Sequence, residues 1–122
     1  MKDYASNPKA NFDYDILETL EAGMVLVGHE VKSVKTGKVS LKGAYVRIIS
    51  GRAMLVGATI TPYQPKNTPA DYDPQQNRPL LLTRKQLDTL LGLSKSHGLT
   101  MVPLKLYDKH GRVKLLVGVA RG

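Results

Sequence analysis

The closing segment, residues 99–122, constrains the fold more than any other part of the chain. It reads LTMVPLKLYDKHGRVKLLVGVARG, which is two strand-like runs joined by a short turn around His110. Apolar residues interleaved with polar ones predict a β-hairpin. The hairpin has one acid, Asp108, and its basic residues are Lys105, Lys109, Arg112, Lys114 and Arg121. So basic a hairpin predicts an anionic partner.

Other strand-like runs occur through the rest of the chain. Residues 12–27 alternate between apolar and polar side chains until Ala22-Gly23, where a glycine predicts a bulge or the close approach of another backbone. Residues 44–49 and 53–60 flank Ser50-Gly51-Arg52 and predict a second hairpin. The triple leucine at 80–82 predicts one more short strand.

Two segments have helical periodicity. The first segment is residues 28–36. One apolar face is predicted by the spacing of Val27, Val31 and Val34. The opposite face is formed by Glu30, Lys32 and Lys35. The second is predicted from Thr83 to His97, with an apolar stripe of leucines. Thr83 and Gln86 have the spacing of a capping box, in which each side chain satisfies the free amide of the other residue.

The remaining segments predict one domain with a loose end. Residues 1–11 are polar and predict an N-terminal arm, and residues 61–79 predict a long surface loop. We expect residues 12–122 to form a single β-barrel domain. We expect a mainly β fold: an antiparallel oligonucleotide-binding-like barrel of about six strands with two or three peripheral helices.

The charge distribution leaves two interpretations open. The net charge is +8, and residues 31–70 contain no acid. A segregated basic surface is typical of nucleic-acid binders, but a solvated face that keeps a protein soluble has the same composition. There is no cysteine, no secretory signal and no apolar run that could span a membrane, so we expect a cytoplasmic protein without membrane contact.

Residues that could support catalysis do not form a recognisable cluster. The three histidines lack metal-ligand spacing, and no phosphate-binding glycine loop or nucleophile motif occurs. Two aspartate pairs, Asp13 with Asp15 and Asp71 with Asp73, could bind magnesium or act as acid and base, but solubility explains them equally simply. We therefore expect no enzyme activity, no metal and no cofactor.

Six ordered blocks of sequence resemble one known family. In order they are LETLEAG (17–23), EVKS (30–33), GKVSL (37–41), LLL (80–82), GLTMVPLKLY (98–107) and GVARG (118–122). In sequence and spacing they are similar to bacterial small protein B, and the resemblance extends from about Asn7 to Gly122. It implies the barrel fold expected above, with residues 12–122 as a single RNA-binding β-barrel domain.

The resemblance also implies a function and partners. Members of that family bind the transfer-RNA-like part of transfer-messenger RNA and bring it to stalled ribosomes, where trans-translation rescues them. The implied partners are this RNA, the ribosome through its small-subunit decoding region and ribosomal RNA, and elongation factor Tu. The implied role is binding and delivery, without catalysis.

Residue by residue, the resemblance assigns RNA contacts. By charge alone, Glu21 is a solvated acid at the end of a strand; matched to the family, it becomes an acceptor for base N–H groups. Leu81 and Lys114 match the other two central contacts. The full set of expected RNA-binding residues is Asn7, Lys9, Glu21, Ala22, Gly23, Lys32, Leu81, Arg112, Lys114 and Arg121.

The chain departs from the family pattern at two places. Family members commonly have lysine or arginine just before the triple leucine, whereas this chain has Arg78-Pro79, which leaves Arg78 as the available cation. The family also continues past ARG into a basic tail, which is absent after Gly122. We therefore expect these residues to bind RNA without completing ribosome rescue.

Two other binding functions stay open at the level of sequence. A generic single-stranded nucleic-acid module would need exposed stacking aromatics, for which Tyr45, Tyr63 and Tyr107 are the candidates. A ribosome-associated protein would use the basic face to bind ribosomal RNA without delivering another RNA.

Overall fold

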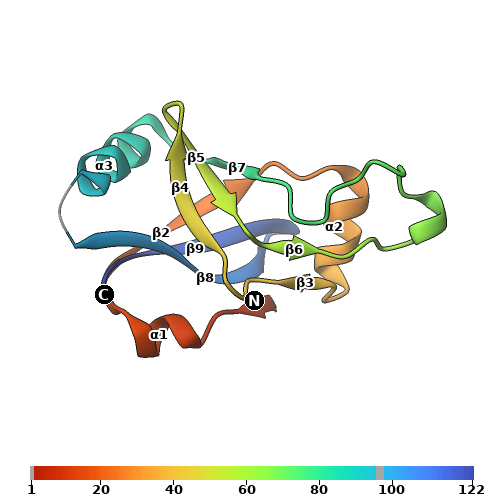
Figure 1. The fold of residues 1–122 in the computed structure, drawn as a ribbon, viewed down its shortest axis with the longest axis horizontal. Helices are drawn as coiled ribbons and strands as arrows, with labels where there is room; N and C mark the ends of the chain where they lie inside the picture. The colour runs from red at the N-terminus through yellow and green to blue at the C-terminus, as the bar shows by residue number, and fades with distance from the viewer. Residues whose placement is uncertain (1, 96–97) are drawn as a thin grey trace.

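The computed structural model describes residues 2–95 and 98–122 of the chain (Figure 1). Strands dominate, as predicted. In chain order the elements are β1 (Asp3–Ser6), α1 (Lys9–Asp13), β2 (Asp15–Met24), α2 (Gly28–Lys35), β3 (Val39–Ser40), β4 (Tyr45–Ile49), β5 (Arg52–Val56), β6 (Thr59–Ile60), the 3-10 turn η1 (Pro65–Asn67), β7 (Arg78–Leu81), α3 (Arg84–Ser94), β8 (Leu99–Lys109) and β9 (Arg112–Arg121).

The strands form one curved antiparallel sheet and one small one. The large sheet has seven strands in the order β1-β8-β9-β2-β7-β5-β4, and β3 pairs with β6. Curvature brings β4 back into contact with β8, as the crossing of the two hairpins in Figure 1 shows. The described part of the chain contains three α-helices, which lie around this sheet. The prediction of a mainly β, barrel-like antiparallel fold with peripheral helices is confirmed.

Both predicted hairpins are present, and both close with two-residue turns. In the β8–β9 hairpin Lys109 pairs with Arg112, and the turn residues His110 and Gly111 have φ values of +52° and +80°. The β4–β5 turn repeats this geometry at Ser50 and Gly51. Positive φ at both central residues matches the right-handed twist of the flanking strands, which is why such turns close hairpins tightly.

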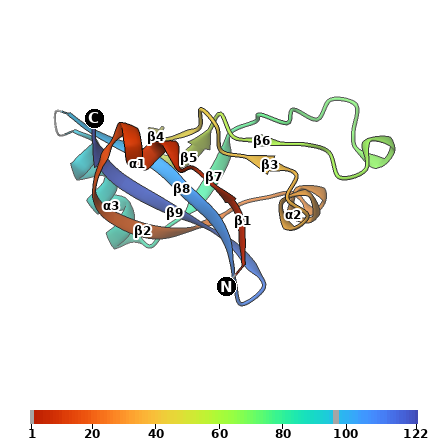
Figure 2. The ribbon, with the colours of Figure 1, turned by 90° about the horizontal axis from the view of Figure 1, so that it is seen from below.

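The β9 strand separates two apolar regions. Leu115, Val117 and Val119 face the main core, which also holds Val34 of α2 and Leu90 of α3. The alternate residues face the outer side of the sheet, where α1 covers one end (Figure 2). The residues of this smaller cluster are Ala10, Val102 and Ala120, with Tyr14, Ile16 and Leu104 packed around them. The other end of the outer face has no helix over it (Figure 2).

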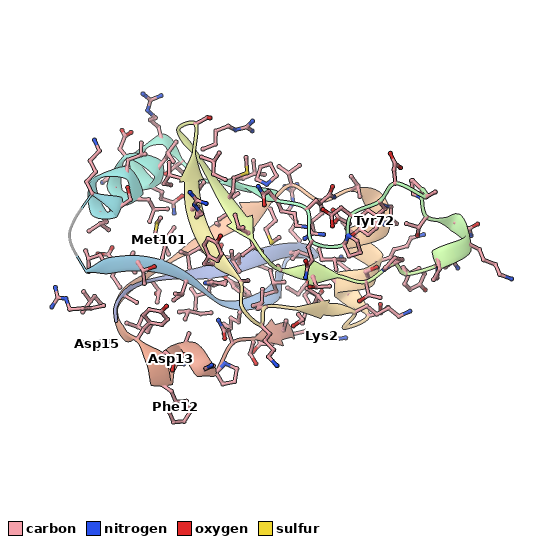
Figure 3. All side chains as sticks on the ribbon, viewed as in Figure 1. Lys2, Phe12, Asp13, Asp15, Tyr72 and Met101 are labelled. Atoms are coloured by element: carbon pink, nitrogen blue, oxygen red, sulfur yellow. The ribbon has the colours of Figure 1, made fainter. Side chains whose placement is uncertain are left out.

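The first residues of the chain are more ordered than predicted. Residues 1–11 were expected to be a loose arm, but β1 pairs with β8 and α1 packs on the outer face. Phe12, expected at the start of a strand, lies in α1 with 90% of its surface exposed and points away from the body (Figure 3). Strand β2 begins at Asp15, whereas Asp13 is the last residue of α1, so this aspartate pair does not lie on one strand.

Both predicted helices form. Thr83 and Gln86 make the predicted capping box: Gln86 N donates to Thr83 Oγ1 at 3.1 Å and Thr83 N donates to Gln86 Oε1 at 2.9 Å. The predicted helix end at His97 lies outside the described residues. The predicted apolar face of α2 is buried only in part: Val34 is fully buried, Val31 is half-buried, and Val27 is 48% exposed.

The predicted exposure of Glu30 and the predicted availability of Arg78 are both wrong. Each side chain is 1% exposed, and Arg78 Nη2 lies 2.6 Å from Glu30 Oε2. The helical periodicity around Glu30 cannot predict its burial, because its partner Arg78 lies on β7, which is distant in sequence and reaches α2 only in the folded protein. The Arg78 guanidinium is therefore buried and is not accessible to an RNA phosphate.

The loop of residues 61–77 is attached to this ion pair. Tyr72 donates from its hydroxyl to Glu30 Oε2 at 2.8 Å, and Gln76 Nε2 donates to the same oxygen at 3.2 Å. Figure 3 shows Tyr72 between the loop and α2. Thus the loop lies on the surface, as predicted, but its second half is fixed by side-chain hydrogen bonds to α2 and β7.

Among the described residues, no helix is long and apolar enough to cross a membrane.

Candidate nucleic-acid interface

One row of paired residues crosses four strands at the open end of the outer face. Tyr107 of β8 pairs with Lys114 of β9, Lys114 pairs with Gly23 of β2, and Gly23 pairs with Leu81 of β7. Residues directly opposite one another on neighbouring strands present their side chains on the same face of a sheet. Four residues that are far apart in sequence therefore lie in line on one surface.

Gly23 allows this row to pack closely. A Cβ atom at Gly23 would lie 3.2 Å from Leu81 Cβ and 3.6 Å from Lys114 Nζ. The missing side chain thus leaves space that Leu81 and the lysine ammonium occupy from opposite sides. The predicted bulge or close backbone approach at Ala22-Gly23 is wrong: strand β2 runs through this position without a register shift, and the atoms closest to Gly23 belong to side chains.

A shallow pocket of about 300 Å³ lies beside this row. Its cationic side chains are Arg112 and Lys114, and Leu81 forms part of its apolar wall. The other apolar lining residues are Met24, Leu26, Val31 and Val113. Leu81 is 58% exposed, although its neighbour Leu80 is 8% exposed. The pocket therefore combines an accessible apolar wall with two cations.

Glu21 lies two residues before Gly23 and so shares its face of the sheet. Its carboxylate accepts a hydrogen bond from the Tyr107 hydroxyl, and Lys109 Nζ lies 3.1 Å from Oε1. The hydrogen bond from Tyr107 lowers the pKa of the Glu21 carboxyl below its ordinary value of 4.5, and Lys109 lowers this pKa further. Glu21 is therefore ionised at neutral pH.

The chemistry of this surface suits an unstacked nucleotide. Ammonium and guanidinium groups neutralise phosphates, an exposed leucine packs against a base, and an ionised carboxylate accepts hydrogen bonds from amino or imino groups. We call Glu21, Gly23, Leu81, Arg112 and Lys114 the outer-face group.

Comparisons with known proteins identify the family. A family model described as SmpB protein matches residues 4–122. The chain belongs to the SmpB family. The resemblance found in the six sequence blocks is thereby confirmed.

Individual SmpB relatives match over nearly the whole chain. The SsrA-binding protein of Thermosynechococcus vestitus is 46% identical over 122 residues, covering 100% of this chain and 80% of the relative. That of Latilactobacillus sakei is 48% identical over 118 residues, covering 97% of this chain and 75% of the relative. A chain from a solved structure described as "tmRNA-SmpB: a journey to the center of the bacterial ribosome" is 46% identical, with a TM-score of 0.75, covering 96% of this chain and 82% of that one.

Other residues that the SmpB resemblance assigned to RNA lie apart from the outer-face group. The Asn7 side chain donates to Pro103 O at 2.9 Å and so fixes the chain between β1 and α1. Lys9 is exposed on α1, with Asp13 4.0 Å away, and Lys32 is exposed on α2. Ala22 is buried in the core, with 1% of its surface exposed, so its expected RNA contact also stays a prediction.

Arg121 lies at the opposite end of β9 from Lys114. Seven residues separate the two, a distance of roughly 23 Å along a strand, and odd spacing turns their side chains to opposite faces. A contact by Arg121 would therefore belong to a different part of a bound RNA from a contact by Lys114. The expected roles of Asn7, Lys9, Lys32 and Arg121 stay predictions.

Sequence reasoning missed the partners of Glu21. The charge pattern places Lys109 only in the basic hairpin, and the aromatic pattern makes Tyr107 only a candidate for base stacking, whereas the structure leaves Tyr107 4% exposed with its ring covered. The available signal was their spacing: residues 105, 107 and 109 alternate onto one face of a strand. The pairing registers of β8 with β9 and of β9 with β2 bring these side chains to Glu21, and neither register can be predicted from local sequence.

Proposed function

We propose that this chain binds the transfer-RNA-like part of transfer-messenger RNA and delivers it to stalled ribosomes for trans-translation. Membership of the SmpB family supports this function, as do the names of the relatives and the ribosomal setting of the solved homologue. The observation that carries it is the outer-face group, which joins cations, an apolar wall and an acceptor on one uncovered surface.

The proposed division of labour follows the chemistry of each side chain. Arg112 and Lys114 neutralise phosphates, which contributes most of the affinity and makes it salt-dependent. Leu81 and Glu21 contact unpaired bases, which gives selectivity for a particular folded loop. The ribosomal decoding region, ribosomal RNA and elongation factor Tu are further proposed partners, and the protein acts in the cytoplasm by binding alone.

A gel-shift titration against the isolated transfer-RNA-like domain tests this function. We expect tight binding that an excess of ordinary transfer RNA or of an unstructured oligonucleotide displaces poorly. Equal displacement by the unstructured oligonucleotide would instead identify a generic single-stranded module. Association with ribosomes in cells that lack transfer-messenger RNA, without affinity for the isolated domain, would identify a ribosomal-RNA binder.

Two variants on one strand test the place of the interface. Lys114→Ala removes a cation from the outer-face group, and Arg121→Ala removes one from the far end of β9. Each lost phosphate contact reduces the slope of log affinity against log salt by about 0.7–0.9. We expect that reduction for Lys114→Ala together with weaker binding, and a smaller change for Arg121→Ala. Unchanged affinity and an unchanged salt slope for Lys114→Ala would contradict the proposed interface.

A further inference from the structure

The Glu21 carboxylate is held by two side chains from a strand that is not its neighbour. Strand β9 separates β2, which carries Glu21, from β8, which carries Tyr107 and Lys109. Two interstrand spacings are about 10 Å, so the three side chains meet above β9. Tyr107 donates to Oε2, and Lys109 Nζ lies 3.1 Å from Oε1 and 3.4 Å from Oε2.

We propose that Tyr107 and Lys109 are positioning residues for RNA recognition: they fix the Glu21 carboxylate so that its free lone pairs accept N–H groups from an unpaired base. This inference rests on the function proposed above, and it adds two residues that act on the RNA through a third.

The capacity of a carboxylate for hydrogen bonds supports this arrangement. Two carboxylate oxygens offer about four acceptor positions. Tyr107 uses one on Oε2, and the Lys109 ammonium lies near one on each oxygen, which leaves at least one position on Oε1 free. The Glu21 side chain remains 33% exposed, so the free positions are accessible to a ligand. Tyr107 is 4% exposed and its ring is fixed by packing, which gives its hydroxyl a defined place. A pre-oriented acceptor loses less conformational entropy when it binds.

Electrostatics explains how an acid can serve on an RNA-binding surface. A lone carboxylate beside phosphates would repel them. Here Lys109 from β8 and Lys114 from β9 both act on Glu21, so the local charge is positive while the acceptor stays ionised. Helix α3 adds no charge at this point: its Gln86 donates to the Glu21 backbone oxygen at 3.5 Å.

Tyr107→Phe tests the positioning role, and Tyr4→Phe is its matched control. Tyr4 lies on strand β1, and its hydroxyl also donates to a carboxylate, Oδ1 of Asp108 on the neighbouring strand β8, at 3.1 Å. Loss of a hydrogen bond to a charged acceptor predicts about tenfold weaker binding of the transfer-RNA-like domain by Tyr107→Phe. We expect unchanged affinity for Tyr4→Phe. Equal affinity for both variants would overturn the proposal.

A double-mutant cycle separates positioning from direct contact. In a Glu21→Ala background, Tyr107→Phe and Lys109→Met should weaken binding no further, because the group they hold is gone. A continued loss for Lys109→Met would show that Lys109 binds phosphate itself, which would overturn its positioning role. A further loss of RNA affinity on adding Tyr107→Phe to Glu21→Ala would show that Tyr107 acts through the fold and not through Glu21, which would overturn its positioning role.

A measurement without RNA supplies an independent test. The carbon-13 chemical shift of the Glu21 carboxyl, followed against pH, measures the pKa of this group. We expect the pKa to move up toward the ordinary value in Tyr107→Phe and to stay unchanged in Tyr4→Phe. An unchanged pKa of Glu21 in Tyr107→Phe would contradict the proposal. If the unaltered chain does not bind the transfer-RNA-like domain, the proposed function fails together with the inference. If it binds, and Lys114→Ala weakens binding while Tyr107→Phe does not, the positioning role alone fails.

Discussion

Arg78 and Glu30, 48 residues apart in sequence, form an ion pair in which both side chains are 1% exposed. Arg78 also donates to Ala58 O and Pro74 O, each at 2.9 Å, and to the Tyr72 hydroxyl oxygen at 3.2 Å. One guanidinium therefore connects β7 to α2, to the segment before β6 and to the surface loop. Burying a charge is costly unless it is paired and hydrogen-bonded, and here both conditions are met.

Removing the buried cation should destabilise the fold strongly. Arg78→Met leaves Glu30 buried without its partner, which predicts a loss of about 3–5 kcal/mol in the free energy of unfolding. Arg84→Met is the control, because the Arg84–Asp88 pair at 3.5 Å is exposed and should contribute no more than about 1 kcal/mol. Urea unfolding of both variants measures the difference, and similar losses would contradict the assigned role of Arg78.

The same ion pair predicts an acid-sensitive fold. Burial acts to raise the pKa of Glu30, but hydrogen bonds from Arg78, Tyr72 and the Val27 N–H outweigh it, and the pKa lies below the ordinary 4.5. A carboxyl with a lowered pKa in the folded state stabilises the protein fully above its unfolded pKa. That contribution is lost as the pH falls through the folded value.

Chemical unfolding followed from about pH 7 down to about pH 3 measures this loss. Glu30→Gln should reduce stability at neutral pH and flatten the acid limb of the stability profile. Glu18→Gln, at an exposed site on β2, should leave the profile parallel to that of the unaltered chain. An acid limb that is equally steep in Glu30→Gln would assign it to other carboxyls.

A methyl group at Gly23 should affect RNA binding more than folding. In Gly23→Ala the new Cβ would meet Leu81 Cβ at 3.2 Å and Lys114 Nζ at 3.6 Å, so Leu81 has to move by a few tenths of an ångström. We expect weaker binding of the transfer-RNA-like domain. Gly92→Ala is the control: its Cβ meets nothing within 4 Å on α3, so it should stabilise the protein by about 0.5–1 kcal/mol and leave binding unchanged.

Two adjacent leucines should separate folding from binding. Leu80 is 8% exposed and packs in the core, so Leu80→Ala should cost about 2–4 kcal/mol of folding stability. Leu81 is 58% exposed, so Leu81→Ala should cost little stability while it weakens RNA binding. Thermal unfolding and gel-shift titration of both variants check this. A stability loss for Leu81→Ala as large as that for Leu80→Ala would contradict the proposed interface.

Local sequence signals predicted the elements that local physics controls. The hairpin turns at Ser50-Gly51 and His110-Gly111 and the capping box at Thr83 depend on residues within three or four positions of each other. Strand β1 was missed because its pairing partner, β8, lies about a hundred residues away in sequence, and four residues carry no periodicity of their own.

The candidate site was predicted in part for a similar reason. Family resemblance pointed to Glu21, Leu81 and Lys114, and the register of β2, β7 and β9 brings Leu81 and Lys114 to Gly23, two residues from Glu21. Tyr107 and Lys109 were not assigned to this group, because their role depends on reaching over β9 to Glu21. The RNA contact that the resemblance implies for Asn7 stays a prediction, and the structure shows that its side chain donates to a backbone oxygen within the fold.

The sequence by itself determined that this chain is a basic, mainly β protein with two hairpins and two well-marked helices, because alternation, turn residues and caps act over a few residues. Only the tertiary structure decided which charges face water and which are buried. Arg78 and Lys114 look alike in the sequence, yet one is paired with Glu30 in the interior and the other lines the outer face. The physical reason is that burial and pairing of a charge depend on strand order and register, which are set by packing between segments distant in sequence.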